Sequence, residues 1–440
     1  MNTTQIITSQ IKYIIENASD FTKICLPYAL IVIVSLYIEE SSLYYYPYVI
    51  IESLVLALMF INIHRHIILN DKNYAVDSGF ICYNENTYPN FIKLLKILGV
   101  ESQKTTMGFS VKSEKKNLEY AGNSLSSLFS QKKNIFSISF LLMIKSILSF
   151  NKNAKKDCST ISPKLTLGEY LKNNNYSKGF IYNYIVPMGA AIWSTKASNM
   201  LDMSALFFIR FFDNHGLLQI KNRPSWWVIR GGSKEYVKKL VSSFKEKIRL
   251  SSPVFSITRK DEKVEIKLSN GKDKIETFDK VVLATHSDQA LRLLSDKTSL
   301  EAEILNALPY QRNEALLHTD HTVLPKNKLA WASWNYNLDQ DSEEPVALTY
   351  NMNILQSINA TETFCVTLNS NGLINPSKVI KKLKYDHPLF TVKGVAAQKR
   401  KNEISGVNNT YFCGAYWRNG FHEDGVVSAL DIAEQFGISL

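Results

Sequence analysis

The sequence predicts an α/β protein with a buried parallel sheet, on the strength of three observations. KVVLAT at 280–285 is an apolar, β-branched strand of the kind found in parallel sheets, and a helical pattern follows it. TYFCGAYW at 410–417 is expected to be another strand, with a loop and a helix after it. Between 253 and 285 lies a run of strands with a hairpin signal at Asn270-Gly271.

Length, composition and charge limit the possible classes of protein and partner. The 440 residues, 45% hydrophobic and 21% charged, suffice for one large domain or two ordinary ones. A net charge of +11, from 51 basic and 40 acidic residues, is compatible with an anionic membrane surface, an anionic ligand or a plain basic protein. No arginine-rich run or zinc-finger spacing indicates nucleic acid, so we expect no nucleic-acid partner.

Cysteines and histidines exclude several chemistries. The five cysteines form no CxxC pair, which argues against a disulfide framework and suits a reducing, cytoplasmic setting. The histidines show no HExxH or zinc spacing, so we expect no metal, and no GxSxG nucleophile motif occurs.

The N-terminal region contains two apolar runs. Residues 24–38 carry no charge, and residues 43–63 carry only Glu52. Either a membrane anchor or buried core elements would have this composition. A signal peptide is not expected, because no basic start leads to a small-residue cleavage site.

Helical patterns dominate the middle of the chain. Helices are expected over 91–99, 136–150 and 203–216, with Gly99 and Gly216 as ends, and over 165–193 with a break near Pro187 and Gly189. A strand, a Gly231-Gly232 turn and a helix follow at 226–248. The apolar, aromatic helices at 135–150 and 202–218 suit a lipid-like ligand and a core equally.

Two strand ends are candidates for ligand contact. Small residues, Ala284 and Thr285, end the first strand, and Ser287 or Asp288 would cap the next helix. The last helix is expected to open at about Gly425 with Asp424 as its N-cap, after Gly414. Its unpaired amides and partial positive charge would suit an electron-rich ligand edge.

Taken together, several stretches resemble the FAD-dependent amine oxidase and phytoene desaturase superfamily, in particular a bacterial subgroup of predicted NAD/FAD-binding proteins. The stretches run in family order from 73 to 430 and include VDSGFICYNENTYPNF, PMGAAIWS, FFDNHGLL, VIRGGSKEYV, VVLATHSDQAL, WASWNY and YFCGAYWRNGFHEDGVVSAL. The resemblance implies a doubly wound FAD-binding domain (71–84, 226–309 and 391–440) and a second, α+β substrate domain (85–225 and 310–390).

The resemblance also implies site residues. Those expected at FAD are Asp77, Ser78, Gly79, Val254, Ala284, Thr285, Gly414, Asp424, Gly425 and Val426. Those expected at the substrate are Trp193, His215, Trp334 and Tyr336. The implied activity is hydride transfer to flavin from an amine or a lipid-like substrate, with a slight preference for the lipid. No catalytic base stands out.

The front of the chain departs from the family. Relatives open with a strand, GxGxxG and a helix, whereas residues 1–78 here contain no glycine and an average composition would give about five. Residues 1–70 therefore form an atypical apolar segment in place of the glycine-rich unit. One hypothesis is a reading-frame disruption between about 25 and 65, which would leave a remnant unable to bind FAD. Another is an evolved membrane anchor over 24–63.

Overall fold

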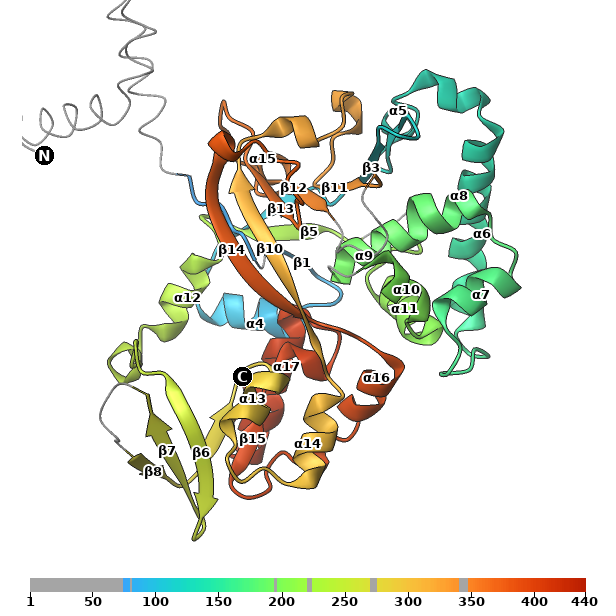
Figure 1. Cartoon of the computed structure of the whole chain (residues 1–440). Coiled ribbons are helices and arrows are strands. Elements are labelled where there is room, and N and C mark those ends of the chain that lie inside the picture. Colours follow the sequence, from blue (N-terminus) through green and yellow to red (C-terminus); the bar gives the residue numbers. More distant parts are fainter. Residues whose placement is uncertain (1–73, 80, 194–195, 220–223, 270–274, 340–346) are drawn as a thin grey trace, which may run out of the picture. The chain divides into compact units, whose positions relative to one another are not determined.

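The computed structural model describes residues 74–79, 81–193, 196–219, 224–269, 275–339 and 347–440 (Figure 1). The chain divides into two compact units, Met1–Tyr74 and Ala75–Leu440, and all the described residues except Tyr74 belong to the second. The apolar segment 24–63 and the proposed frame disruption lie outside the described residues. Among the helices that are described, none is long and apolar enough to cross a bilayer.

A mixed seven-stranded sheet forms the larger part of the second unit. Its order is β14-β10-β13-β12-β11-β3-β4. All neighbours are antiparallel except β11 and β3, which are parallel. Two long strands, β10 and β14, form the curved ribbon in Figure 1. The bounds are β3 Phe109–Ser113, β4 Leu118–Ala121, β10 Tyr310–His318, β11 Trp334–Asn337, β12 Leu348–Asn351, β13 Cys365–Leu368 and β14 Val379–Pro388.

Helices from the middle of the chain pack with this sheet around a single aromatic core. Phe150, Phe180 and Phe208 are fully buried in it, together with Tyr120 and Tyr336 from the sheet. The helices are α5 Leu125–Leu128, α6 Ile138–Asp157, α7 Leu167–Asn173, α8 Lys178–Phe180, α9 Val186–Trp193, α10 Ala197–Asp202 and α11 Ala205–Asn214. The predicted helices at 136–150 and 203–216 are therefore present, and Gly216 has the positive φ of a helix end.

The predicted break near Pro187 and Gly189 is not where the helix is irregular. A π-helical turn occupies Ile181–Ile185, and α9 continues through both residues. Gly189 is needed for packing, since a Cβ there would lie 2.6 Å from Met200 and 2.8 Å from Phe208. The glycine therefore marks a close helix contact and not a helix end.

A second region contains KVVLAT, the strand that the sequence predicts to lie in a parallel sheet, and the later strand TYFC. β9 (Val281–Leu283) and β15 (Thr410–Phe412) pair in parallel, Val282 opposite Tyr411. Beside them, β6 (Val254–Lys260), β7 (Lys263–Leu268) and β8 (Ile275–Phe278) form an antiparallel sheet. The pairing of β7 with β8 agrees with the hairpin signal, whose residues 270–271 lie outside the described part. Helices α13 Ser287–Leu293, α14 Ser299–Asn306, α16 Val392–Gln398 and α17 His422–Gln435 complete the region.

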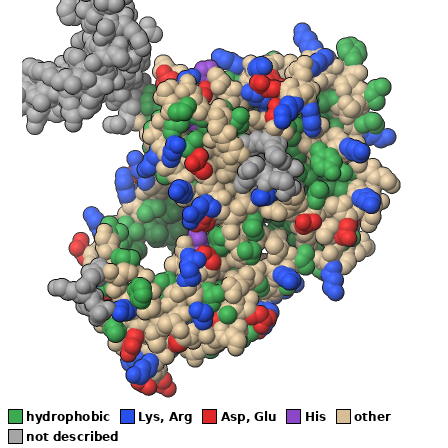
Figure 2. Space-filling model, in the orientation of Figure 1, with side chains coloured by type: hydrophobic (Ala, Val, Ile, Leu, Met, Phe, Trp, Pro, Cys, Tyr) green, Lys and Arg blue, Asp and Glu red, His purple; other side chains and the backbone are tan. Residues whose placement is uncertain are grey.

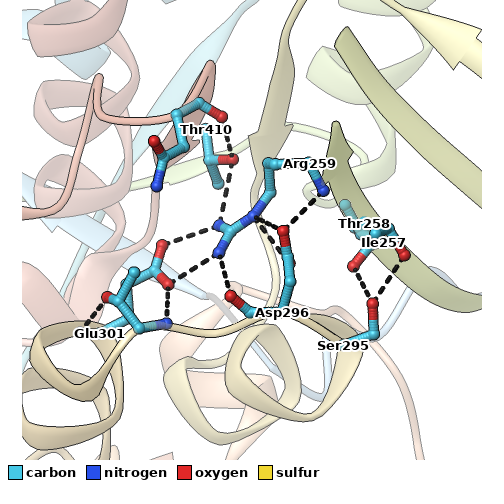
Figure 3. Close-up of polar contacts among 9 residues, drawn as sticks. Ile257, Thr258, Arg259, Ser295, Asp296, Glu301 and Thr410 are labelled. Carbon is cyan, nitrogen blue, oxygen red and sulfur yellow. Dashed lines mark hydrogen bonds and ion pairs between the residues drawn. The ribbon is translucent and has the colours of Figure 1, made fainter. Parts of the chain in front are cut away.

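A buried arginine joins three elements of this region (Figure 3). The Arg259 guanidinium, on β6, donates to both carboxylate oxygens of Glu301 on α14 at 2.8 and 2.9 Å. It also donates to Asp296, and to Thr410 Oγ1 on β15 at 3.4 Å. The Arg259 and Glu301 side chains are only 6% and 3% exposed. Such a bidentate pair is strong because each charge leaves water with its hydrogen bonds satisfied.

A three-stranded sheet, β1-β5-β2, connects the two regions of the unit. It consists of β1 Cys82–Asn84, β5 Trp226–Ile229 and β2 Ser102–Thr105, with α4 (Pro89–Ile97) and α12 (Lys234–Val241) beside it. As predicted, the turn after β5 uses Gly231 and Gly232, with φ of +82° and +91°. The Asp77 carboxylate accepts from the Ser233 amide at 2.9 Å and thereby fixes this turn.

Candidate functional site

The described residues enclose a large cavity of about 770 Å³. Its wall is mainly apolar and aromatic, and it draws on segments that are far apart in sequence: 79, 81–94, 107–123, 184–192, 211–217, 226–240, 334, 350–355, 387 and 415–440. Among the described residues, no Asp, Glu, Lys or Arg side chain lines it. A cavity of this size and chemistry suits an organic cofactor together with an apolar substrate.

The first turn of α17 is fixed to its surroundings by two buried carboxylates. Glu423 accepts from the backbone amides of Asn90 at 3.0 Å and Phe91 at 2.8 Å, and so caps the start of α4. Asp424 accepts from the Phe421 amide at 2.9 Å and closes the loop before its own helix. Burial raises the pKa of Asp424 to about 6, although the amides that it accepts from act in the opposite direction.

The role expected for Asp424 needs a correction. The helix begins at His422 with Phe421 as N-cap, and Asp424 lies at the third helical position. From there its carboxylate reaches back to the N-cap amide, as the third residue of a capping box does. The same correction applies to α13, which begins at Ser287 with His286 as N-cap in place of Ser287 or Asp288.

The start of α17 also reaches the cavity wall directly. His422 Nε2 lies 2.7 Å from the Tyr236 hydroxyl of α12, and both side chains line the cavity. Gly425 lies one turn further on, where a Cβ would have no atom within 4 Å. The wall at this point is therefore bare backbone beside open space, next to Val426.

The histidines of the wall are neutral at physiological pH. Burial lowers the pKa of His215 and of His422 to about 4, and it also lowers the pKa of His387. His215 Nδ1 donates to the Phe211 carbonyl at 3.0 Å, and its ring stacks on Phe211 at 3.9 Å. These side chains therefore add hydrogen-bonding atoms to the cavity without adding charge.

One buried donor in the wall has no partner among the described residues. The indole Nε1 of Trp334 is inaccessible to water and makes no hydrogen bond there, while the ring packs edge-on against Tyr350 at 5.8 Å. Buried polar atoms are rarely left unpaired. Trp334 lines the cavity with other atoms of its ring, so a ligand acceptor reaches this N–H only with a shift of the side chain.

These features fit a flavin. The 14-residue helix α17 directs its N-terminus to the cavity wall, where the partial positive charge favours an electron-rich ring edge. Gly425 leaves room for close approach to the backbone. The loops after β9 and β15, which begin at Ala284 and Cys413, follow a parallel strand pair, the place where α/β sheets bind nucleotides.

The structure brings some of the predicted residues together and not others. Five line the cavity: Gly79, His215, Trp334, Gly425 and Val426. Asp77, Ser78, Gly414 and Asp424 flank it in sequence, and Ser78 Oγ lies 2.8 Å from the Tyr385 hydroxyl. Val254, Ala284 and Thr285 lie at the ends of β6 and β9, away from the wall. Trp193 and Tyr336 are buried in the aromatic core.

Sequence reasoning missed much of the wall. The missed residues include Tyr120, Asn123, Met188, Tyr236, Ala415, Phe421 and His422. For Phe421 and His422 a signal existed, because both stand immediately before the predicted helix start. For Tyr236 there was none, since its contact with His422 joins positions 186 residues apart.

The fold and the cavity define a class of protein: an α/β nucleotide-binding architecture joined to an α+β region around one apolar site. Residues 68–328 match the model of the family described as flavin containing amine oxidoreductase. The chain therefore belongs to the flavin containing amine oxidoreductase family, which indicates a flavin cofactor and oxidoreductase chemistry. The comparison with curated proteins gives no match.

Solved structures agree on the fold. A CLA-producing fatty acid isomerase from P. acnes superposes with a TM-score of 0.60 at 12% identity, over 83% of this chain and 89% of that chain. Cyclohexylamine oxidase from Brevibacterium oxydans IH-35A gives 0.56 at 12% identity, over 82% and 88%. Putrescine oxidase bound to putrescine gives 0.54 at 11% identity, over 81% and 87%. At these identities the likeness establishes the amine oxidase fold alone.

Proposed function

We propose that the protein is an FAD-dependent oxidoreductase acting on a lipid-like substrate, whose uncharged chain lies in the apolar cavity. The observation that carries the proposal is the composition of the wall: none of the described residues that line it has an ionised side chain. A charged amine would enter such a cavity without a carboxylate to pair with it, at a large desolvation penalty. An alkyl chain would gain free energy there.

The residues of the chain have separate tasks in this proposal. Bound FAD would supply the hydride acceptor. Gly425, Val426 and the N-terminus of α17 would hold the edge of the flavin ring. The rest of the cofactor would be faced by the other residues expected at FAD: Asp77, Ser78, Gly79, Val254, Ala284, Thr285 and Gly414. The apolar wall would exclude water, and the Trp334 N–H would orient a carbonyl or carboxyl oxygen of the substrate.

An amine substrate is the competing candidate. The family description names amine oxidoreductases, and the titles of two similar structures name amine substrates. Such a substrate would bind as the free base, against the aromatic rings of the wall, which include Trp334 and Tyr350. The two candidates therefore differ in the charge state and chain length that the cavity accepts.

The test uses the full-length chain, purified, incubated with FAD and desalted. Retained flavin absorbance is expected, followed by bleaching under anaerobic conditions with an uncharged long-chain unsaturated lipid, a fatty-acid methyl ester, and not with primary amines. Bleaching by amines alone would refute the lipid-like substrate. A folded protein that retains no flavin would support the alternative of a catalytically impaired remnant.

A matched variant ties the substrate to the wall. Trp334→Phe keeps an aromatic ring and removes the unpaired N–H, so we expect flavin retention to be unchanged and affinity for the methyl ester to fall about tenfold, roughly the loss of one well-placed hydrogen bond. Unchanged affinity for the ester in Trp334→Phe would remove the proposed role of the indole.

A further inference from the structure

Helix α6 carries apolar side chains on its solvent-exposed side. Helix α6 buries Phe140, Met143 and Phe150 on one side. On the opposite side the first half of the same helix exposes Ile138, at 75%, together with further apolar side chains, Leu141, Leu142 and Leu148. A surface helix ordinarily carries polar residues on the side away from the core.

The apolar surface extends beyond the helix. In the turn before α6, Phe136 is 86% exposed, and Leu125 of α5 is 77% exposed. We call the whole set the α5–α6 patch: Leu125, Ile135, Phe136, Ile138, Leu141, Leu142 and Leu148. Large contiguous apolar patches on soluble proteins mark interaction surfaces.

Charge around the patch is mainly positive, although Lys155 of α6 pairs with Asp213 at 3.1 Å. Between Tyr120 and Lys164 the sequence has seven lysines, at 132, 133, 145, 152, 155, 156 and 164, and one acidic residue, Asp157. That carboxylate accepts from the Tyr170 hydroxyl at 2.6 Å. Lys145 and Lys152 follow the apolar residues along the exposed side of α6, and neither forms an ion pair with any described residue. Figure 2 shows apolar and basic side chains together along the margin where Figure 1 places α5 and α6.

We propose that the α5–α6 patch docks the protein on an anionic lipid bilayer. A helix that lies in a membrane interface inserts its apolar side chains between lipids and places lysines among anionic headgroups. Nucleic acid would use the lysines and leave the exposed Phe136 and Leu141 without a role. A second copy of this chain, placed symmetrically, would oppose two lysine rows.

The patch also lies close to the cavity. Phe140, on the buried side of α6, packs edge-on against Tyr120 at 5.5 Å between ring centroids, and Tyr120 lines the cavity wall. The docked helix is therefore one layer of side chains from the site. The docking proposal goes beyond the proposed function and does not rest on it, since its test measures binding and not turnover.

The test is cosedimentation of the full-length chain with phosphatidylcholine vesicles, with and without phosphatidylglycerol. Phe136→Glu/Leu141→Glu should weaken binding to the anionic vesicles at least tenfold. The control Phe255→Glu/Leu250→Glu changes the same residue types and charge at positions 64% and 83% exposed on β6 and the loop before it, and should leave binding unchanged. Lys145→Ala and Lys152→Ala should each weaken binding about fivefold.

Hydroxyl-radical footprinting identifies the surface that binds. Phe136 and Leu141 should become protected only when anionic vesicles are present. Vesicle binding without this protection, or unchanged in Phe136→Glu/Leu141→Glu, would overturn the proposal and point to another part of the chain, such as residues 24–63. Protection of Phe136 and Leu141 in the absence of vesicles would also overturn it. If that protection increases with protein concentration, a second copy of the chain covers the patch; if it does not, a segment of the same chain covers it.

Discussion

Gly425 offers the most direct test of where the flavin lies. It is the fourth residue of α17, its φ is not positive, and an added Cβ would have no protein atom within 4 Å. Alanine is therefore free of steric conflict with the chain. Replacing a helical glycine by alanine stabilises a helix by up to about 1 kcal/mol. If bound flavin occupies the open space, the same methyl group obstructs it.

Gly425→Ala should therefore raise stability and lower flavin affinity together. For a unit of this size we expect a gain of about 2 °C in the thermal midpoint of the apoprotein. The dissociation constant for FAD should rise at least tenfold, about 1.4 kcal/mol. Thermal unfolding followed by circular dichroism measures the first quantity, and quenching of flavin fluorescence on titration measures the second.

Gly179→Ala is the matched control. Gly179 is helical, and its added Cβ would meet Met143 and Ser139 at an ordinary 3.6 Å, away from the cavity wall. This variant should gain similar stability and bind FAD as the wild type does. If Gly425→Ala gains stability and keeps full affinity for FAD, the start of α17 does not contact the flavin, and the fit argued from its N-terminus is wrong.

Three further substitutions test the groups that hold this framework. Arg259→Leu leaves the buried carboxylate of Glu301 without its partner and should lower the free energy of unfolding in urea by about 3–5 kcal/mol. The control Arg312→Leu, at a largely exposed ion pair, should lower it by less than about 1 kcal/mol. Equal losses in the two variants would refute the claim that burial makes the Arg259 ion pair more important for stability. Glu423→Ala removes the carboxylate that accepts from two amides of α4 and should cost about 1–3 kcal/mol in the same assay, with no loss as the contrary result. Burial raises the pKa of Asp424 to about 6, so the contribution of this carboxyl group to stability is fully present below pH 4 and is lost as pH rises through 6. Asp424→Asn should therefore remove a decline in stability between pH 4 and 6. An unchanged pH profile of stability in the variant would contradict this.

Local sequence signals predicted the local structure. Gly99 and Gly216 end helices as expected, and the Gly231-Gly232 turn has the positive φ values that only glycine adopts easily. KVVLAT and TYFC form the parallel strand pair of β9 and β15, but the burial expected of KVVLAT is only partly found: β15 is buried along its length, whereas Val282 of β9 is 47% exposed. The helix starts at His422 and Ser287 were misplaced. Asp424 is the third helical residue of α17, where a carboxylate looks like an N-cap in sequence, and Ser287 and Asp288 are the first two residues of α13.

The cavity could be predicted only in part, because its wall is assembled by long-range contacts. The end of the cavity at α17 had a local signal in the glycine and the helix start at 421–426. The opposite wall had none: Tyr120, Met188 and Phe211 belong to apolar segments whose composition is equally right for the core. Which aromatic residue faces the cavity and which the core depends on packing, as Phe211 and its neighbour Phe212 show.

Helix α6 shows the same limit most clearly. ISFLLMIKSILSF has apolar residues at every angle around the helix, so its periodicity predicts a helix without saying which side is buried. In the structure Tyr120 and Phe180 cover one side, and nothing described covers Ile138 and Leu141 on the other. A helix that is apolar all round is ordinarily buried all round. The core covers one side of α6. The lysines beside the exposed apolar side favour a lipid surface as what covers that side.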